Sequence, residues 1–161
     1  LGDAIAISAM KYKKFGKMDF KKLHPAGSLG AQLKTVEDIM ITGKKIPFVK
    51  ENILSSKALK ILSKKKLGIL IVIDKNNNTS GIITDGQIRR LSQKNPYFQS
   101  LPVKEIMTKK PISIDKSELA AKALSLMNNK KITSLIVNNF KNPKKTIGVV
   151  HVHTILQSNI S

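Results

Sequence analysis

The chain has 161 residues, of which 41% are hydrophobic and 24% are charged, and it contains no cysteine. This length allows one or two small domains with hydrophobic cores, and the lack of cysteine excludes disulfide bonds and thiolate metal sites. The net charge of +19 comes almost entirely from lysine, because Arg89 and Arg90 are the only arginines. Proteins that read nucleic acid rely heavily on bidentate arginine. We therefore interpret the lysines as a solvated surface that attracts small anions, and we expect no nucleic-acid partner.

Residues 1–35 precede the pattern that organises the rest of the chain. Their first apolar residues share the spacing of one buried helix face: Leu1, Ile5, Ala9 and Met10. No strand precedes this helix, so the segment looks like the last helix and linker of a larger α/β domain. No apolar run approaches the roughly 18 residues of a membrane span, and the first residues lack the basic start of a signal peptide. We expect a cytoplasmic protein with no membrane partner.

The remainder of the chain contains an internal repeat. The sequence VEDIM at 36–40 returns as VKEIM at 103–107, and GIITDGQIRRL at 81–91 returns as GVVHVHTILQS at 148–158. Both pairs are separated by the same offset of 67 residues, from 36 to 103 and from 81 to 148. Two markers at one offset indicate a duplicated structural unit.

Both copies present the same order of elements. A short extended segment, at 45–49 or 111–114, leads into an amphipathic helix. An apolar, β-branched strand follows at 67–74 or 132–139, and then a turn, a second strand and a final helix. Each copy is therefore predicted to be β-α-β-β-α.

Polar residues before the first helix of each copy predict side-chain caps. In the second copy, Asp115 is expected to cap the helix and Glu118 to complete a capping box. In the first copy, Ser55 or Ser56 is expected to play this part.

About 60 residues bury only a marginal core, so the two copies should pack as a pseudo-twofold pair. This arrangement resembles the cystathionine β-synthase (CBS) domain pair, or Bateman module, over residues 36–158. The fold class is therefore expected to be α/β, or α+β, with a tandem CBS pair. We predict the domain boundaries as 1–35 for the preceding remnant, 36–95 for the first CBS domain and 103–161 for the second.

The resemblance implies ligand clefts, for molecules such as adenosine nucleotides, between the two sheets. In that family the second strand ends Gly-hydrophobic-hydrophobic-Thr/Ser-x-x-Asp, where the hydroxyl reaches a phosphate or ribose and the carboxylate binds ribose hydroxyls. Here Thr84 keeps the hydroxyl, but Gln87 takes the acidic position. In the second copy His151 takes the hydroxyl position and Thr154 the acidic one. Because both carboxylates are missing, the sequence argues against ordinary adenosine binding.

Several polar residues remain candidates for the wall of such a cleft: Thr84, Gln87, Arg89, Arg90, Ser134, His151 and Thr154. The alternative for Thr84 and Asp85 is a helix cap. His151 and His153 stand two apart at a strand end, but no third ligand is in register. We expect them to have a polar cleft or interface role and predict no metal site.

The junction ahead of the repeat carries a second, more specific resemblance. LGDAIA at 1–6 and the segment FKKLHPAGSLG at 20–30 run directly into the two CBS repeats. They closely resemble the arabinose 5-phosphate isomerase family, in which a sugar isomerase (SIS) domain precedes the CBS pair. The family junction reads Phe-x-x-x-His-Pro-Gly-Gly-x-Leu-Gly, and Ala26 replaces its first glycine here. The forms of the repeat signatures, including the histidine pair, also resemble this family.

The resemblance implies that His24 is a catalytic residue. Moving a proton between two carbons through an enediol, and opening a sugar ring, needs a group that exchanges protons near neutral pH. A histidine before proline is otherwise a loop or helix-cap residue, and this alternative stays open.

The resemblance further implies a partial D-arabinose 5-phosphate isomerase in the synthesis of Kdo for lipopolysaccharide. Its substrate would be a sugar phosphate, and enediol chemistry requires no metal or redox cofactor. The family's other catalytic groups lie in the SIS domain, so we expect this chain alone not to isomerise. The CBS pair would add regulation or assembly, with a nucleotide or CMP-Kdo as effector, in a homo-oligomer (dimer or tetramer). The alternative is a free-standing CBS-pair sensor of nucleotides without catalysis.

Overall fold

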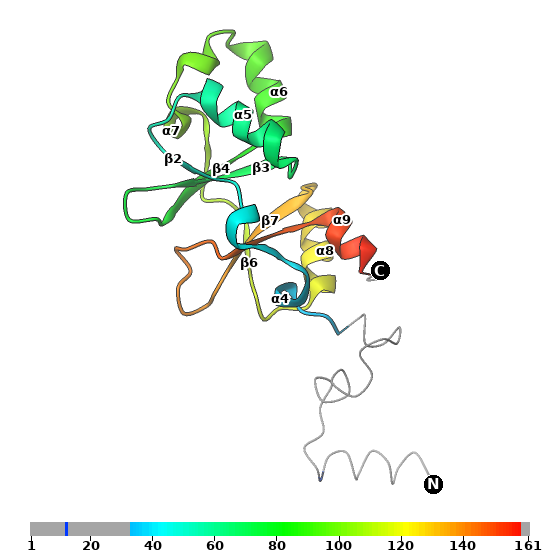
Figure 1. Ribbon diagram of the computed structural model, residues 1–161. Coiled ribbons are helices and arrows are strands. Elements are labelled where there is room, and N and C mark those ends of the chain that lie inside the picture. The colour runs from blue at the N-terminus through cyan, green and yellow to red at the C-terminus, as the bar shows by residue number, and fades with distance from the viewer. Residues whose placement is uncertain (1–11, 13–32, 159–161) are drawn as a thin grey trace.

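The structure is a computed structural model that describes Tyr12 and residues 33–158, shown in Figure 1. Its strands form two four-stranded sheets, ordered β2-β3-β4-β5 and β1-β8-β7-β6. The first sheet consists of β2 (Phe48–Lys50), β3 (Ile69–Ile73), β4 (Thr79–Thr84) and β5 (Thr108–Lys109). The second consists of β1 (Ile41–Thr42), β8 (Gly148–His151), β7 (Ser134–Asn138) and β6 (Ser113–Asp115).

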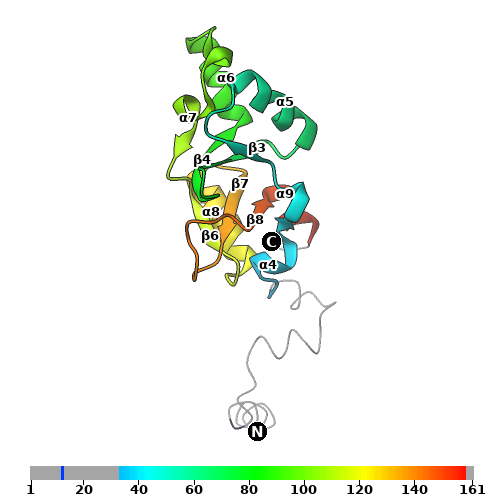
Figure 2. The ribbon, with the colours of Figure 1, turned by 60° about the vertical axis from the view of Figure 1, so that its left-hand side comes forward.

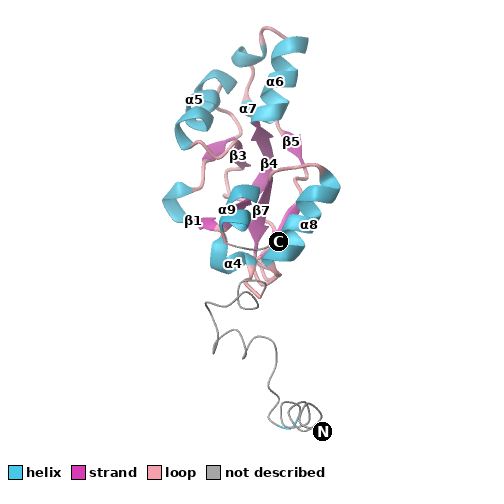
Figure 3. Cartoon of the chain, turned by 90° about the vertical axis from the view of Figure 1, so that its right-hand side faces the viewer, coloured by secondary structure: helices cyan, strands magenta, loops and turns pink. Residues whose placement is uncertain are grey.

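Helices cover the outer face of each sheet. The first sheet carries α5 (Ser55–Lys65), α6 (Asp85–Lys94) and α7 (Val103–Ile106), and the second carries α4 (Val36–Ile39), α8 (Ala120–Lys130) and α9 (Val152–Gln157). Short 3-10 turns lie at Gly43–Lys45 and Phe98–Ser100. Figures 2 and 3 show the result as four layers, with the two sheets between the two groups of helices. The predicted fold class and the β-α-β-β-α order of each copy are confirmed. None of the described helices is long and apolar enough to span a membrane.

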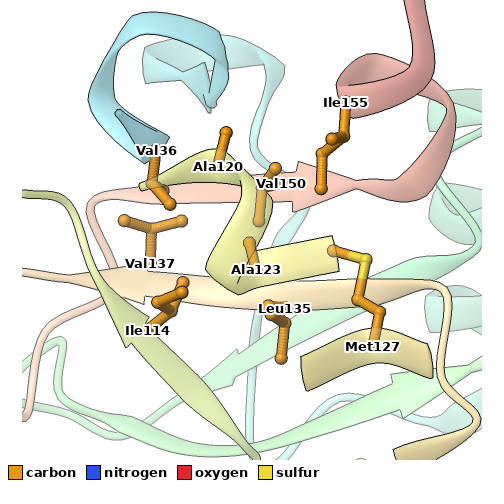
Figure 4. Packing of buried hydrophobic residues seen from close by; sticks show 9 residues of the cluster. All are labelled: Val36, Ile114, Ala120, Ala123, Met127, Leu135, Val137, Val150 and Ile155. Carbon is orange, nitrogen blue, oxygen red and sulfur yellow. The ribbon is translucent and has the colours of Figure 1, made fainter. Parts of the chain in front are cut away.

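The apolar run of β3 is explained by burial on both of its faces. Leu70 and Val72 point into the core beneath the first sheet's helices, whereas Ile69 and Ile71 belong to the layer between the sheets. That layer also contains Ile136 of β7. The second sheet repeats the arrangement, and Figure 4 shows the nine buried residues between it and its helices. An unbroken apolar and mostly β-branched sequence, without polar alternation, is typical of a strand that is covered on both faces.

A hydrogen bond joins the two copies at equivalent positions. The Thr79 and Thr146 hydroxyls lie 2.7 Å apart, and the Thr146 N–H donates to the Thr79 hydroxyl at 3.1 Å. Positions 79 and 146 differ by the repeat offset of 67 residues. Equivalent residues in direct contact place these threonines near the pseudo-twofold axis, as the repeat predicts.

The two segments that carry the VEDIM and VKEIM motifs are exchanged between the sheets. Strand β1, from the first copy, pairs antiparallel with β8 of the second, and β5, from the second copy, pairs antiparallel with β4 of the first. Helices α4 and α7 follow the same exchange, since Val36 packs in the second sheet's core and Val103 in the first's. Each sheet is therefore completed by the other copy.

The exchanged segments also cap the first helix of each copy, so the predicted side-chain caps are wrong. The Ser55 N–H and hydroxyl both donate to the Leu101 carbonyl, at 2.9 and 2.7 Å. The Ala120 N–H donates to the Lys34 carbonyl at 2.9 Å. Asp115 instead accepts hydrogen bonds from Ser117 in a local turn. A backbone carbonyl from a distant segment has taken the place of the side-chain acceptor.

In each copy a glycine precedes the last apolar residues of the second strand of the β-α-β-β-α unit. Close packing of the exchanged segment against this glycine leaves no room for a side chain. A Cβ on Gly81 would lie 2.6 Å from the Thr108 carbonyl oxygen and 2.8 Å from the Met107 sulfur. A Cβ on Gly148 would lie 2.5 Å from the Met40 sulfur. The methionine that ends each repeated motif thus packs on the glycine of the other copy.

We predict that Gly81→Ala lowers the free energy of unfolding by about 1–3 kcal/mol, the usual range for overpacking. Gly148→Ala should lower the free energy of unfolding by less, because the atom nearest to the new Cβ belongs to the flexible side chain of Met40. Gly86→Ala is the matched control, since its Cβ would meet nothing nearer than 3.6 Å. Urea denaturation followed by circular dichroism measures all three. A Gly81→Ala protein as stable as Gly86→Ala would contradict the exchanged packing.

Candidate functional site

The candidate site comprises two equivalent strand ends, one in each sheet, each followed directly by a helix. Thr84 ends β4 and is the N-cap of α6, and His151 ends β8 and is the N-cap of α9. The two positions differ by the repeat offset, from 84 to 151. Exposed N–H groups at a helix start favour an acceptor or an anion. The local chemistry at these ends therefore suits a polar ligand.

In the first copy, Thr84 acts as the predicted helix cap. Its hydroxyl oxygen accepts a hydrogen bond from the Gln87 N–H at 3.3 Å. The hydroxyl proton has no acceptor among the described residues, so a half-buried donor remains available at the end of β4. The cap and a ligand contact are compatible, because one uses the oxygen lone pairs and the other the proton.

The Gln87 side chain is engaged with the exchanged segment. Its amide nitrogen donates to the Ile106 carbonyl, and its amide oxygen accepts from the Thr108 hydroxyl at 3.2 Å. These bonds fasten α6 to α7 and β5. The residue at the family's carboxylate position thus has a clear structural task, while its contact with a ligand stays a prediction.

Both arginines of α6 are exposed. A Cβ on Gly86 would lie 3.6 Å from a guanidinium nitrogen of Arg90, so this guanidinium lies over the first turn of α6. Neither Arg89 nor Arg90 forms an ion pair with a described residue. Arg90 therefore supplies a positive charge over the first turn of α6 that is not paired with a described carboxylate.

In the second copy, the three predicted residues lie together. Ser134 of β7 is directly opposite His151 of β8, and Thr154 lies in the first turn of α9. All three are half-buried. The Thr154 carbonyl accepts a hydrogen bond from the Ser158 hydroxyl at 2.9 Å. No hydrogen bond within the described ranges links this group to the Thr84 group, so the candidates form two clusters.

The surroundings of the His151 ring favour its neutral form. Its Nδ1 accepts a hydrogen bond from the His153 N–H at 3.2 Å, and the two rings stack with their centroids 5.0 Å apart. Partial burial, and secondarily the neighbouring His153, lower the pKa of His151. The described part of the chain contains no group of three potential metal ligands around this pair. The second cluster thus presents two hydroxyls and an imidazole where the first has a guanidinium.

A pocket that the sequence did not predict lies against the exchanged α7–β5 segment. It measures about 730 Å³ and is lined by Glu51, Lys104, Glu105, Met107 and Lys109. Its wall is the same α7–β5 segment to which Gln87 is bonded. The repeated VKEIM motif was the available signal, but the motif alone does not show that its segment crosses to the other sheet.

The predicted catalytic residue, His24, lies outside the described residues, as do residues 1–11 and 13–32. Its role stays a prediction.

Comparison with known sequences identifies both parts of the pattern. The chain matches the CBS domain family at residues 36–94 and 103–160. It is 40% identical over 158 residues to arabinose 5-phosphate isomerase KdsD of Francisella tularensis. The aligned region covers 98% of this chain and 47% of that protein. It is 35% identical over 161 residues to KdsD of Escherichia coli K12, which covers 99% and 48%. The chain spans about half the length of these curated relatives.

Solved structures show the same architecture. CBSX2 of Arabidopsis thaliana, in complex with AMP, has a TM-score of 0.67 and 25% sequence identity, over 77% of this chain and 94% of that one. A CBS-domain protein of Agrobacterium tumefaciens has a TM-score of 0.71 at 15% identity, over 80% and 96%. The second likeness concerns the fold alone.

The lowered pKa of His151 predicts that stability falls with acidification. Between pH 7.5 and 5.5 the unfolded histidine, with a pKa of about 6.5, binds more protons than the folded one, so acid favours unfolding. His151→Asn keeps an N-cap acceptor without titrating. We expect its melting temperature to depend less on pH over this window than that of the unmodified protein, as followed by circular dichroism. Identical pH slopes for the two proteins would contradict this assignment.

Proposed function

Because the chain belongs to the CBS domain family, as a tandem pair of these domains, we propose that it is the regulatory C-terminal part of an arabinose 5-phosphate isomerase. The complete enzyme would interconvert D-ribulose 5-phosphate and D-arabinose 5-phosphate, on the route to Kdo and lipopolysaccharide. The observation that carries this proposal is the extent of the similarity. Identity to KdsD covers 98–99% of the chain, whereas the CBS matches begin only at residue 36. A CBS pair alone would not explain likeness over residues 1–35.

In this proposal His24 exchanges protons at the isomerase centre. Isomerisation removes a proton from one carbon of the sugar, passes through an enediol, and returns a proton to the neighbouring carbon. The oxygens on those carbons must lose and gain protons in step, which an imidazole with a pKa near neutrality can do. The remaining catalytic groups would come from the sugar isomerase domain of the complete protein.

The CBS pair would supply regulation through its two strand ends. Arg90 places a positive charge over the first turn of α6, and the Thr84 hydroxyl at the start of this helix has a proton that no described acceptor uses. An anionic effector such as CMP-Kdo, which carries a phosphate and a carboxylate, would find both a cation and a donor there. A nucleotide is the second candidate, because the related CBSX2 structure contains AMP. A sensor without catalysis is the corresponding alternative function.

Activity of the complete protein tests the isomerase. We expect the product of the whole reading frame to interconvert the two pentose phosphates. His24→Ala should lower kcat by about 10²–10⁴, the usual contribution of a general acid or base. Lys57→Ala, an exposed change on α5, is the control. No isomerisation by the unmodified protein would favour the sensor, and an active His24→Ala enzyme would remove His24 from the catalytic centre.

Isothermal titration tests the effector. We expect CMP-Kdo to bind the chain more tightly than AMP, because the carboxylates that hold an adenosine ribose are replaced by Gln87 and Thr154. Arg90→Gln should weaken CMP-Kdo binding about tenfold, as for loss of one charge-assisted hydrogen bond. Arg89→Gln is the matched control on the same helix. Tight AMP binding that Arg90→Gln leaves unchanged would contradict the proposed ligand.

A further inference from the structure

Two backbone hydrogen bonds at equivalent positions join each copy to the exchanged helix of the other. The Glu37 N–H, on α4 of the first copy, donates to the Lys116 carbonyl of the second at 2.9 Å. The Lys104 N–H, on α7 of the second copy, donates to the Glu51 carbonyl of the first at 3.0 Å. Glu51 directly follows β2, as Lys116 directly follows β6. The four residues therefore form two matching contacts between the copies.

The charges at these positions are reversed from one contact to the other. In the second sheet a glutamate on the exchanged helix faces a lysine, and the Lys116 ammonium lies 2.7 Å from the Glu37 carboxylate. In the first sheet a lysine on the exchanged helix faces a glutamate, and Lys104 and Glu51 line the same pocket. Their side chains form no ion pair among the described residues, but unlike charges on bonded neighbours still attract each other. Both contacts thus join unlike charges.

The reversal matters because a repeat allows a second kind of pairing. Two chains could associate copy with like copy, first with first and second with second, through the same exchange of segments. The layer between the sheets does not oppose this, since both copies contribute apolar, β-branched residues to it. The charges do oppose it. A pair of first copies would place Glu37 against Glu51, and a pair of second copies would place Lys104 against Lys116.

We propose that these four charges direct each copy to the other copy of its own chain and disfavour the pairing of like copies. An exposed ion pair contributes little to stability, but specificity depends on the difference between two pairings. Each pair of copies contains two such contacts, and both change from attraction to repulsion when like copies meet. The proposal does not depend on the isomerase function.

Charge-reversed variants of the full 161-residue chain separate the two pairings without changing the net charge. Glu51→Lys with Lys104→Glu keeps unlike charges within the chain, but it also makes like copies complementary. Glu37→Lys with Lys116→Glu does the same through the other contact. Reversal of all four residues restores repulsion between like copies and is the matched control.

A thiol near the pseudo-twofold axis reports which copies have paired. The chain has no cysteine, and the Thr79 and Thr146 hydroxyls lie 2.7 Å apart. With Thr79→Cys, pairing within the chain places the thiol beside Thr146, whereas pairing of first copies brings two thiols together. Each protein is refolded from urea at about millimolar concentration, which matches the effective concentration for a short linker. Circular dichroism confirms folding, and disulfide-linked dimer is measured after oxidation by non-reducing electrophoresis.

We expect both double variants to give about tenfold more disulfide-linked dimer than the chain with its natural charges. The four-residue variant should return to the low yield. Equal yields from all four proteins would overturn the proposal. A high yield in the four-residue variant, or a rise in only one double variant, would also overturn it, because the charge pattern would then not be the cause. A double variant that does not fold would contradict it as well, since both doubles keep unlike charges within the chain.

Discussion

Both faces of each small sheet must be covered, and this constraint shapes the molecule. The central strands β3 and β7 are apolar on both sides, so helices can satisfy only one of their faces. The other face requires a second sheet of the same kind. With both faces of the sheets covered, polar side chains are accommodated at the ends of the strands. Thr84 and His151 occupy two such ends. Duplication, layered packing and the position of the candidate site therefore have one physical origin.

The elements of the fold were predictable because their signals are local. Periodicity and turn residues predicted the β-α-β-β-α part of both copies, and the repeated motifs predicted the pseudo-twofold relation, but the short elements α4, β1, α7 and β5 were not predicted. The exchange of β1 and β5 was not predictable, because backbone pairing between distant segments leaves no local pattern. The same reason explains the helix caps: Ser55 and Asp115 are good capping residues, but a carbonyl from across the fold replaced them.

The candidate residues could be located at strand ends from the sequence, but their hydrogen-bond partners could not. The repeat signature led to Thr84 and His151, and the structure places Ser134 opposite His151, while the part of these residues in a cleft stays a prediction. What sequence could not show is which polar atoms are already used. The Gln87 amide is bonded to the exchanged segment, while the Thr84 hydroxyl proton is free of any described partner. The two similar motifs therefore end differently, since one bears a guanidinium and the other a pair of stacked imidazole rings.

The exchange of β1 and β5 has a consequence for a protein that contains only one copy. A single copy would form a sheet that lacks one edge strand, because the first strand of each copy pairs with the sheet of the other copy. Two such chains could complete each other only by swapping these segments as a dimer. Joining the two copies in one chain makes their association intramolecular. For a short linker the effective concentration of one copy around the other is about millimolar. Two copies in one chain can differ in sequence, as Thr84 and His151 do at equivalent positions, because each copy fits only its own covalent partner.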